Sequence, residues 1–207
     1  MDRLSAVTAV SRFLVAAALL AVAAVACDGK TERAAGEAPS RTNGAKVHTG
    51  QTASPEAFCD VHASDATGAV FHWPELAGGA AVPAATPGWR WVNVWATWCK
   101  PCVAEMPRLA AARDQLAAAG KRVELTFVSI DDADADVAGF RKDHPDAPAS
   151  IRVAGTDQRT AWLKSLHLGD GAIPIHLFVS PANRLRCARA GEVRDQDLAV
   201  VEQLVAE

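Results

Sequence analysis

The sequence predicts an α/β fold with one folded domain. Short apolar runs that suit buried strands alternate with longer runs that carry a helical period. The chain closes on two apolar runs joined by a tight turn and followed by a last helical stripe, and no internal repeat is present. This order is typical of helices packed against a mixed sheet. The 207 residues, 50% of them hydrophobic, suffice for one domain with its own core.

The elements expected in the folded part begin with an N-terminal hairpin over 57–73. Its two strands, AFCDVHA and AVFHW, flank the turn SDATG. A connection rich in Gly and Pro follows, and strands then alternate with helices. The expected strands are 89–96, 122–130, 150–155, 175–180 and 184–191, and the expected helices are 100–119, 132–144, 157–168 and 198–205.

The first 26 residues are predicted to be a signal peptide. Arg3 and Arg12 precede an uncharged apolar run, 13–26, which is shorter than the roughly 20 residues that a membrane span needs. Small residues then lead to Cys27, and the letters AVAC resemble a bacterial lipobox, at which the cysteine is lipidated. We therefore expect a lipoprotein anchored at the membrane through Cys27 and facing the periplasm. Cleaved soluble export and an uncleaved anchor are the alternatives.

Residues 27–55 are predicted to be a disordered tether, because they are rich in small, polar and charged residues and have no hydrophobic period. The folded domain is then 56–207. The net charge of −3 gives no basic footprint for nucleic acid. Hydropathy beyond the first segment is too low for a protein with several membrane spans. The chain is expected to act as a monomer.

Cys99 and Cys102 form a C-x-x-C motif where a strand should end and a helix should begin. This position puts Cys99 at a helix N-terminus, where free backbone N–H groups and the helix dipole stabilise a thiolate. Cys102 lies about one turn further along, and Pro101 suits the first turn because its missing N–H would have no partner there. Thiol–disulfide exchange needs this pairing of an exposed attacking sulfur with a sheltered resolving sulfur.

Two other interpretations of the motif are a zinc site and an inert disulfide. A zinc site needs two more ligands at suitable spacing, but the chain has no second C-x-x-C, and its six histidines are scattered. No metal site is therefore predicted. An inert disulfide is compatible with export, but it leaves the surrounding Trp98, Glu105 and Pro107 unexplained.

The five cysteines include two outside the motif and the leader, Cys59 and Cys187. If Cys27 carries lipid, four cysteines remain, which is an even number in an oxidising compartment. Cys59 and Cys187 then form either a long-range structural disulfide or two separate buried thiols. The sequence leaves both possibilities open.

Residues 92–107, VNVWATWCKPCVAEMP, resemble the active-site stretch of the thioredoxin superfamily. They are most similar to the extracytoplasmic TlpA/ResA-like thiol–disulfide oxidoreductases, whose pattern is matched by Trp98, Glu105 and Pro107. The resemblance runs from about residue 57 to the C-terminus and implies a thioredoxin fold. Residues 131–168 resemble the inserted helix–strand element of this branch.

The resemblance also implies roles for residues outside the C-x-x-C motif. Glu105 matches a helix glutamate near the cysteines, which implies that it accepts the resolving thiol's proton. Cytoplasmic thioredoxins instead use a buried Asp in the preceding strand, where this chain has Asn93. The alternative is that Glu105 is an ordinary exposed helix residue.

The implied substrate-binding residues are Trp98, Ile173 and Pro174. Pro174 matches the family's cis-proline, and a cis bond there leaves the Ile173 peptide groups free to pair with an extended substrate. A trans proline in a loop is the alternative. Ile175 stands where the family often has Thr, which leaves the substrate preference open. Trp98 is expected at the rim of the site.

The function implied by the resemblance is thiol–disulfide exchange that reduces protein disulfides outside the cytoplasm, as in cytochrome c maturation. The implied partners are a disulfide-bearing protein substrate and a membrane thiol donor of electrons, with no cofactor besides the redox-active Cys99–Cys102 disulfide. One alternative is a thiol peroxidase, for which Thr97 lies near Cys99. The other is a copper(I) chaperone that uses Cys99, Cys102 and His176 as ligands.

Overall fold

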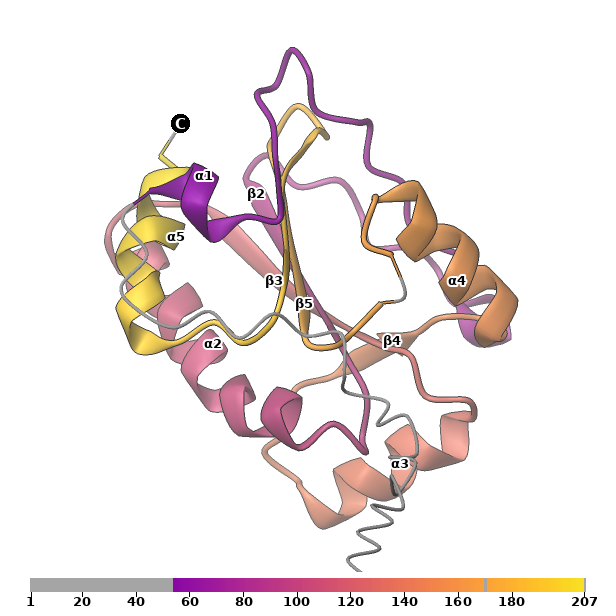
Figure 1. Cartoon of the computed structure of the whole chain (residues 1–207). Coiled ribbons are helices and arrows are strands. Elements are labelled where there is room, and N and C mark those ends of the chain that lie inside the picture. The colour runs from indigo at the N-terminus through magenta and orange to yellow at the C-terminus, as the bar shows by residue number, and fades with distance from the viewer. Residues whose placement is uncertain (1–53, 170, 207) are drawn as a thin grey trace, which may run out of the picture. The chain divides into compact units, whose positions relative to one another are not determined.

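A six-stranded mixed sheet runs through the part of the chain that the structure, a computed structural model, describes: residues 54–169 and 171–206. The strand order is β1-β6-β5-β2-β3-β4, and Figure 1 shows the helices packed around this sheet. The strands are β1 (Val61–His62), β2 (Trp89–Trp95), β3 (Val123–Ser129), β4 (Ser150–Arg152), β5 (Ile175–Val179) and β6 (Leu185–Ala190). The helices are α1 (Pro55–Phe58), α2 (Lys100–Ala118), α3 (Asp134–Asp143), α4 (Gly155–Ser165) and α5 (Leu198–Leu204), with 3₁₀ turns η1 (Ala77–Gly79) and η2 (Asp195–Asp197).

Strand β2 occupies the middle of the sheet, and all of its residues are buried. It pairs in parallel with β3, and α2 supplies the crossover that a parallel pair needs. On its other side it pairs antiparallel with β5, which pairs antiparallel with β6. Burial on both faces explains why apolar residues stand at consecutive positions of β2 instead of alternating with polar ones, Arg90 and Asn93 being its two polar residues.

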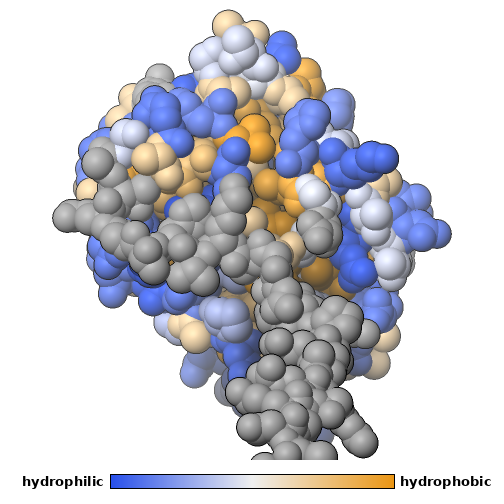
Figure 2. Space-filling view, viewed as in Figure 1, coloured by the Kyte–Doolittle hydropathy of each residue, from blue (hydrophilic) through white to orange (hydrophobic). Residues whose placement is uncertain are grey.

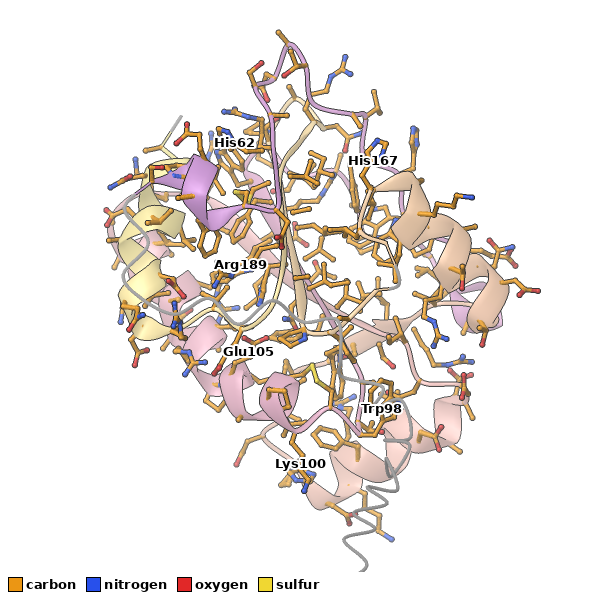
Figure 3. The ribbon with its side chains drawn as sticks, in the orientation of Figure 1. His62, Trp98, Lys100, Glu105, His167 and Arg189 are labelled. Atoms are coloured by element: carbon orange, nitrogen blue, oxygen red, sulfur yellow. A yellow bond between two sulfur atoms is a disulfide. The ribbon has the colours of Figure 1, made fainter. Side chains whose placement is uncertain are left out.

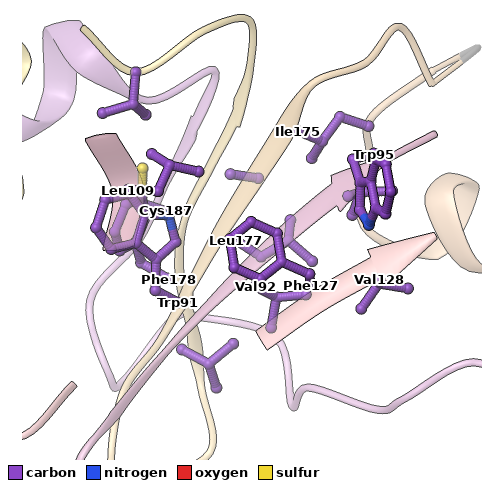
Figure 4. Packing of buried hydrophobic residues seen from close by; sticks show 14 of the residues in the cluster. Trp91, Val92, Trp95, Leu109, Phe127, Val128, Ile175, Leu177, Phe178 and Cys187 are labelled. Atoms are coloured by element: carbon purple, nitrogen blue, oxygen red, sulfur yellow. The ribbon is translucent and has the colours of Figure 1, made fainter. Parts of the chain in front are cut away.

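Helices cover both faces of the sheet: α1, α2 and α5 lie on one face, and α4 lies on the other (Figure 1). Because successive side chains of a strand point to opposite faces, each strand contributes to two core layers. Trp91 and Phe178 are direct cross-strand partners, and their tilted rings pack with 5.1 Å between the centroids. Val92 and Leu177 pair next to them and point to the opposite face (Figure 4).

The predicted α/β class is confirmed, and the elements after residue 88 lie close to their expected positions. The inserted helix–strand element is α3 followed by β4, which pairs in parallel with β3 at the edge of the sheet. Helix α4 begins at Gly155, two residues before its expected start. The C-terminal hairpin of β5 and β6 turns at Asn183, whose φ of 59° lies in the left-handed region that Asn tolerates.

The N-terminal hairpin predicted over 57–73 is wrong. Pro55 begins a helical turn that Ser54 caps, and this turn takes up the start of the expected first strand. Val61 pairs with Ala188 of β6, and Val70 forms a bridge with Arg184 in the turn after β5. Both segments therefore pair with the C-terminal hairpin instead of with each other. This pairing satisfies backbone groups along β6 that would otherwise form an open sheet edge.

Cys59 and Cys187 are joined by a disulfide between the end of α1 and β6. Their Cα atoms lie 5.4 Å apart, although 128 residues separate them in sequence. The Cys187 side chain points to the face of the sheet that carries Trp91 and Phe178 (Figure 4). The bond therefore links the first described helix to the core.

The predicted signal peptide (1–26) and Cys27 lie outside the described residues, as does the predicted tether up to residue 53. In residues 54–169 and 171–206, no helix is long and apolar enough to cross a membrane. Polar residues cover much of the face in Figure 2, with apolar surface gathered toward its middle. The large hydrophobic side chains exposed in the described part are Val70, Val82 and Trp98.

Candidate active site

The Cys99–Cys102 disulfide lies at the N-terminus of α2, directly after the loop that leaves β2. Cys99 is the N-cap residue, and its Sγ accepts the backbone N–H of Cys102 at 3.3 Å. Pro101 lies in the first turn, where a helix has no use for its missing N–H. The local sequence therefore places one sulfur at the helix N-terminus and the other one turn inside.

Cys99 is less exposed than the sequence suggested. Its exposed fraction is 2%, against 0% for Cys102, so both cysteines are buried in this disulfide form. The Cys99 side chain turns back over the first helical turn, toward the Cys102 amide, instead of pointing outward. The neighbouring Trp98 is 44% exposed. Figure 3 shows it on the same side of the molecule as Lys100, at the start of α2.

Trp98 forms one wall of a pocket of about 480 Å³ beside the disulfide loop. The opposite wall comes from α4, which contributes Thr156 and Arg159, and the exposed Asp132 lies at the end of β3. Arg159 also donates to the backbone oxygen of Ile130 at 3.1 Å, which holds α4 against this strand end. The rim of the site thus combines an aromatic face with charged and hydroxyl groups.

Asp131 holds the loop that carries Trp98 and Cys99, a role that the sequence analysis did not assign. Its carboxylate accepts the Thr97 backbone N–H at 3.1 Å and the Thr97 hydroxyl at 2.8 Å. Ser129 Oγ donates to the same carboxylate at 2.7 Å. Asp131 is buried, so these donors replace the water that the carboxylate loses. Its position directly after an apolar strand was the one available sequence signal.

Glu105 is fully buried, which rules out the interpretation that it is an exposed helix residue. Its Oε1 accepts from Asn93 Nδ2 at 3.0 Å, and its Oε2 accepts the Val193 backbone N–H at 3.0 Å. Glu105 lies three residues after Cys102, on the same face of α2. Figure 3 shows its side chain pointing from α2 toward the sheet.

A row of polar side chains crosses three strands opposite Glu105. Asn93 on β2 pairs directly with His176 on β5, and His176 pairs directly with Arg189 on β6. All three side chains are buried. Trp91 Nε1 donates to His176 Nδ1 at 3.1 Å, while His176 Nε2 lies 3.2 Å from Glu105 Oε1. From the sequence, His176 was expected at the surface of a strand, with a role in the site or as a copper ligand as the alternatives; the structure buries it completely.

Arg189 on β6 is the last residue of this row and lies next to α1 and η2. Its guanidinium donates to the Phe58 carbonyl at 2.9 Å and lies 3.6 Å from the Asp197 carboxylate. Burial lowers the pKa of Arg189, while the Asp197 carboxylate acts in the opposite direction and favours the charged guanidinium. The row therefore begins with a neutral amide and ends with a buried, paired cation.

Pro174 lies beside the end of β2, where the disulfide loop begins. The Ile173–Pro174 peptide bond is cis, and both residues are buried. Strand β5 starts at Ile175, opposite Val94, so the antiparallel register brings Pro174 level with Trp95. Ile173 thus precedes the ladder with β2 and lies next to the loop that leads to Cys99.

No group of three or more His, Cys, Asp or Glu side chains suited to a metal ion occurs within residues 54–169 and 171–206. The histidine of the polar row has its two ring nitrogens directed toward Trp91 and Glu105.

No protein-family model and no curated protein sequence matches the chain. Among solved structures, a thiol:disulfide interchange protein from Bacteroides sp. matches with a TM-score of 0.50 and 21% identity, over 68% of this chain and 91% of that one. The chain has a thioredoxin fold. A further match is the thioredoxin domain of a thiol-disulfide oxidoreductase from Bacteroides vulgatus, with a TM-score of 0.48 and 20% identity over 64% of this chain and 91% of that one. Another is a thioredoxin-related protein from Neisseria meningitidis serogroup B, with a TM-score of 0.48 and 25% identity over 61% of this chain and 88% of that one.

Within the thioredoxin fold, the site brings together chain segments that are far apart in sequence. The disulfide lies at the start of α2, with the cis peptide bond of Pro174 beside the end of β2. Glu105 lies one helical turn inside, under the polar row. This arrangement offers a cleavable S–S bond and a buried carboxylate within one short segment.

Proposed function

We propose that the protein is a thiol–disulfide oxidoreductase that reduces disulfides of other proteins outside the cytoplasm. The observation that carries this proposal is the Cys99–Cys102 disulfide at the N-terminus of α2, one turn from the fully buried Glu105. A helix N-terminus stabilises a thiolate, and a nearby carboxylate can take up a proton. An inert disulfide requires neither of these features.

The reaction transfers two electrons from the protein dithiol to the substrate. Cys99, as a thiolate, attacks one sulfur of the substrate disulfide, which breaks that bond and releases a thiolate that takes a proton from water. Cys102 then gives its proton to Glu105 and attacks Cys99 Sγ. The second substrate sulfur leaves as a thiolate, which also takes a proton from water, and the Cys99–Cys102 bond forms. The products are a substrate dithiol and an oxidised protein, which must be reduced again before the next turnover.

Ile173, Pro174 and Trp98 are proposed to bind the substrate chain. The register between β2 and β5 begins after Pro174, so the Ile173 peptide precedes the ladder and is suited to pair with an extended segment. The half-exposed indole of Trp98 offers an apolar contact next to the attacking sulfur. These contacts use the substrate backbone and one neighbouring side chain.

The proposed setting is the periplasmic face of a bacterial membrane, with Cys27 as the lipid anchor and a monomeric chain. The Cys59–Cys187 disulfide supports it, because such bonds persist in oxidising compartments. A reductase there needs electrons from elsewhere, and we propose a membrane thiol donor. Its substrates are proposed to be of the cytochrome c maturation type, and the disulfide is the only redox group that the reaction needs.

The experiment that tests this function is the midpoint potential of the Cys99/Cys102 pair, measured by equilibration in graded thiol buffers, thiol tagging and mass analysis. A value at or below about −250 mV, near that of thioredoxin, is expected for a reductase. A value above about −180 mV, toward that of DsbA, would contradict the reducing direction. Peroxide consumption or copper(I) retention without dithiol exchange would favour the two alternative functions.

A further inference from the structure

The protonation state of His176 follows from its partner on the neighbouring strand. An indole N–H can only donate a hydrogen bond, so His176 Nδ1, which receives the Trp91 hydrogen at 3.1 Å, must carry a lone pair. The neutral ring then carries its own hydrogen on Nε2. Forming an imidazolium would put a second hydrogen against the Trp91 N–H and break this contact. Because both rings are fully buried, water does not compensate for that loss.

The hydrogen on His176 Nε2 faces Glu105. Nε2 lies 3.2 Å from Oε1, although the angle falls outside the range of a well-formed hydrogen bond. Together with Asn93 Nδ2 and the Val193 N–H, it is one of the N–H groups directed at this buried carboxylate. Donors that surround a carboxylate in a site without water favour its ionised form. An ionised Glu105 is the form that can receive a proton from Cys102.

We propose that His176 is a positioning residue, held neutral by Trp91, that keeps Glu105 oriented and ionised as the proton acceptor for Cys102. This inference rests on the proposed thiol–disulfide exchange. His176 cannot itself pass the proton on, because Nδ1 is occupied by Trp91 and Nε2 already carries a hydrogen. The proton from Cys102 therefore remains on Glu105 until a later step of the cycle, and His176 neither gains nor loses charge.

The charged groups around this pair come from several elements. Arg189 of β6 is the register partner of His176 and is paired with Asp197 of η2. The charges of Asp60, Arg194 and Glu105 also act on Arg189. The neighbour from β2 is the neutral Asn93. The cation on the β6 side of His176 therefore has its own carboxylate partner, and the charged group nearest to His176 Nε2 is Glu105.

The test measures how fast Cys102 resolves a mixed disulfide in the full chain, using a disulfide-bearing peptide, rapid acid quench and mass analysis from pH 5.5 to 8.5. His176→Leu removes the donor and is expected to slow resolution about tenfold, at the lower end of what one hydrogen bond to a charged group supplies. The acid limb of its rate–pH profile should move to higher pH. His176→Gln keeps a neutral donor and should lose less than about threefold.

Trp91→Phe tests whether the hydrogen bond from Trp91 keeps the His176 ring neutral. It frees Nδ1 from the Trp91 N–H, so His176 becomes able to bind a second proton, and a pH dependence that the wild type lacks should appear in the resolution rate. His72→Gln, at an exposed histidine, is the matched control and should behave as the wild type. Near-UV circular dichroism checks that each variant is folded.

The outcomes separate the two proposals. A wild type that performs no dithiol exchange contradicts the proposed function itself. A wild type that exchanges while folded His176→Leu matches it at every pH overturns the role of His176. If His176→Leu does not fold, Trp91→Phe decides. A pH dependence that the wild type lacks supports the proposal that Trp91 keeps His176 neutral, and an unchanged rate–pH profile overturns it.

Discussion

Asn93 Nδ2 donates a hydrogen bond to Glu105 Oε1 over 3.0 Å, and both side chains are fully buried. The contact joins the central strand to α2, the helix at whose N-terminus Cys99 and Cys102 lie. An amide that cannot ionise thus stands beside the carboxylate. If a proton moves between side chains at this position, Glu105 is the group able to take it.

Glu105→Gln is expected to slow resolution of the mixed disulfide by about a hundredfold, because the variant keeps the shape of the site but loses the proton acceptor. The mixed disulfide with a peptide substrate should accumulate and be visible by mass analysis after acid quench. Glu202→Gln, an exposed position on α5, is the control. Equal resolution rates in Glu105→Gln and the wild type would contradict the role of the carboxylate.

Asp131→Ala is expected to lower the free energy of unfolding by about 1–3 kcal/mol, because it leaves the buried donors of Thr97 and Ser129 without an acceptor. The loop before Cys99 should also loosen, which lowers the exchange rate. Urea unfolding measures the first effect, and peptide reduction measures the second. Asp132→Ala removes the exposed neighbouring carboxylate and should leave the unfolding midpoint unchanged.

Replacing Cys59 and Cys187 together by Ala is expected to lower the free energy of unfolding by about 2–5 kcal/mol, because the bond closes a long loop in the unfolded chain. Their separation of 128 residues places this loop among the long ones. The comparison uses urea unfolding without reductant. The Cys99/Cys102 potential should stay at its wild-type value. A variant as stable as the wild type would show that the cross-link does not restrict the unfolded chain.

The ion pair between Asp134 and Arg152 predicts a pH dependence of stability. The hydrogen bond from Arg152 Nε, at 2.6 Å, holds the pKa of Asp134 below its ordinary value of 3.8. A lowered carboxyl pKa stabilises the fold above the ordinary value, and this contribution is lost as the pH falls through the lowered one. Stability should therefore decline on acidification below about pH 4, and less steeply in Asp134→Asn.

Urea midpoints between pH 2.5 and 7 measure this dependence. Asp143→Asn, on the same helix, is the control and should keep the wild-type slope. Parallel plots of urea midpoint against pH for the wild type and Asp134→Asn would mean that the ion pair between Asp134 of α3 and Arg152 of β4 does not form in solution. High salt should weaken the effect of Asp134, because its side chain is largely exposed.

The sequence predicted those residues of the candidate site that lie close to one another along the chain. Cys99, Cys102 and Glu105 follow one another at about one helical turn each, so a short motif is enough to associate them. The alternation of apolar runs with helical runs likewise predicted the α/β class, because buried strands and amphipathic helices differ in the spacing of their apolar residues. Pro174 lies far from the motif in sequence, and only the family resemblance singled it out as a neighbour of the cysteines.

The residues that the sequence missed act through pairing between distant strands. His176 and Arg189 become neighbours of Glu105 only through the register of β5 and β6. The N-terminal hairpin was wrong for a similar reason: two short strand-like runs around a turn cannot reveal that a third segment is a better partner. Asp131 lies just after β3, but the two Thr97 donors that it satisfies come from the loop that leaves β2.

The polar row across β2, β5 and β6 has a consequence for folding. A slip of β5 by one residue would turn His176 to the opposite face and bring an aliphatic neighbour toward Glu105. The buried carboxylate and Arg189 would then face apolar side chains, which costs far more than the loss of a well-packed methyl group. The polar row therefore adds its own penalty for a register slip to the packing cost that apolar strands also have. The row thus selects one alignment during assembly and rejects its near neighbours.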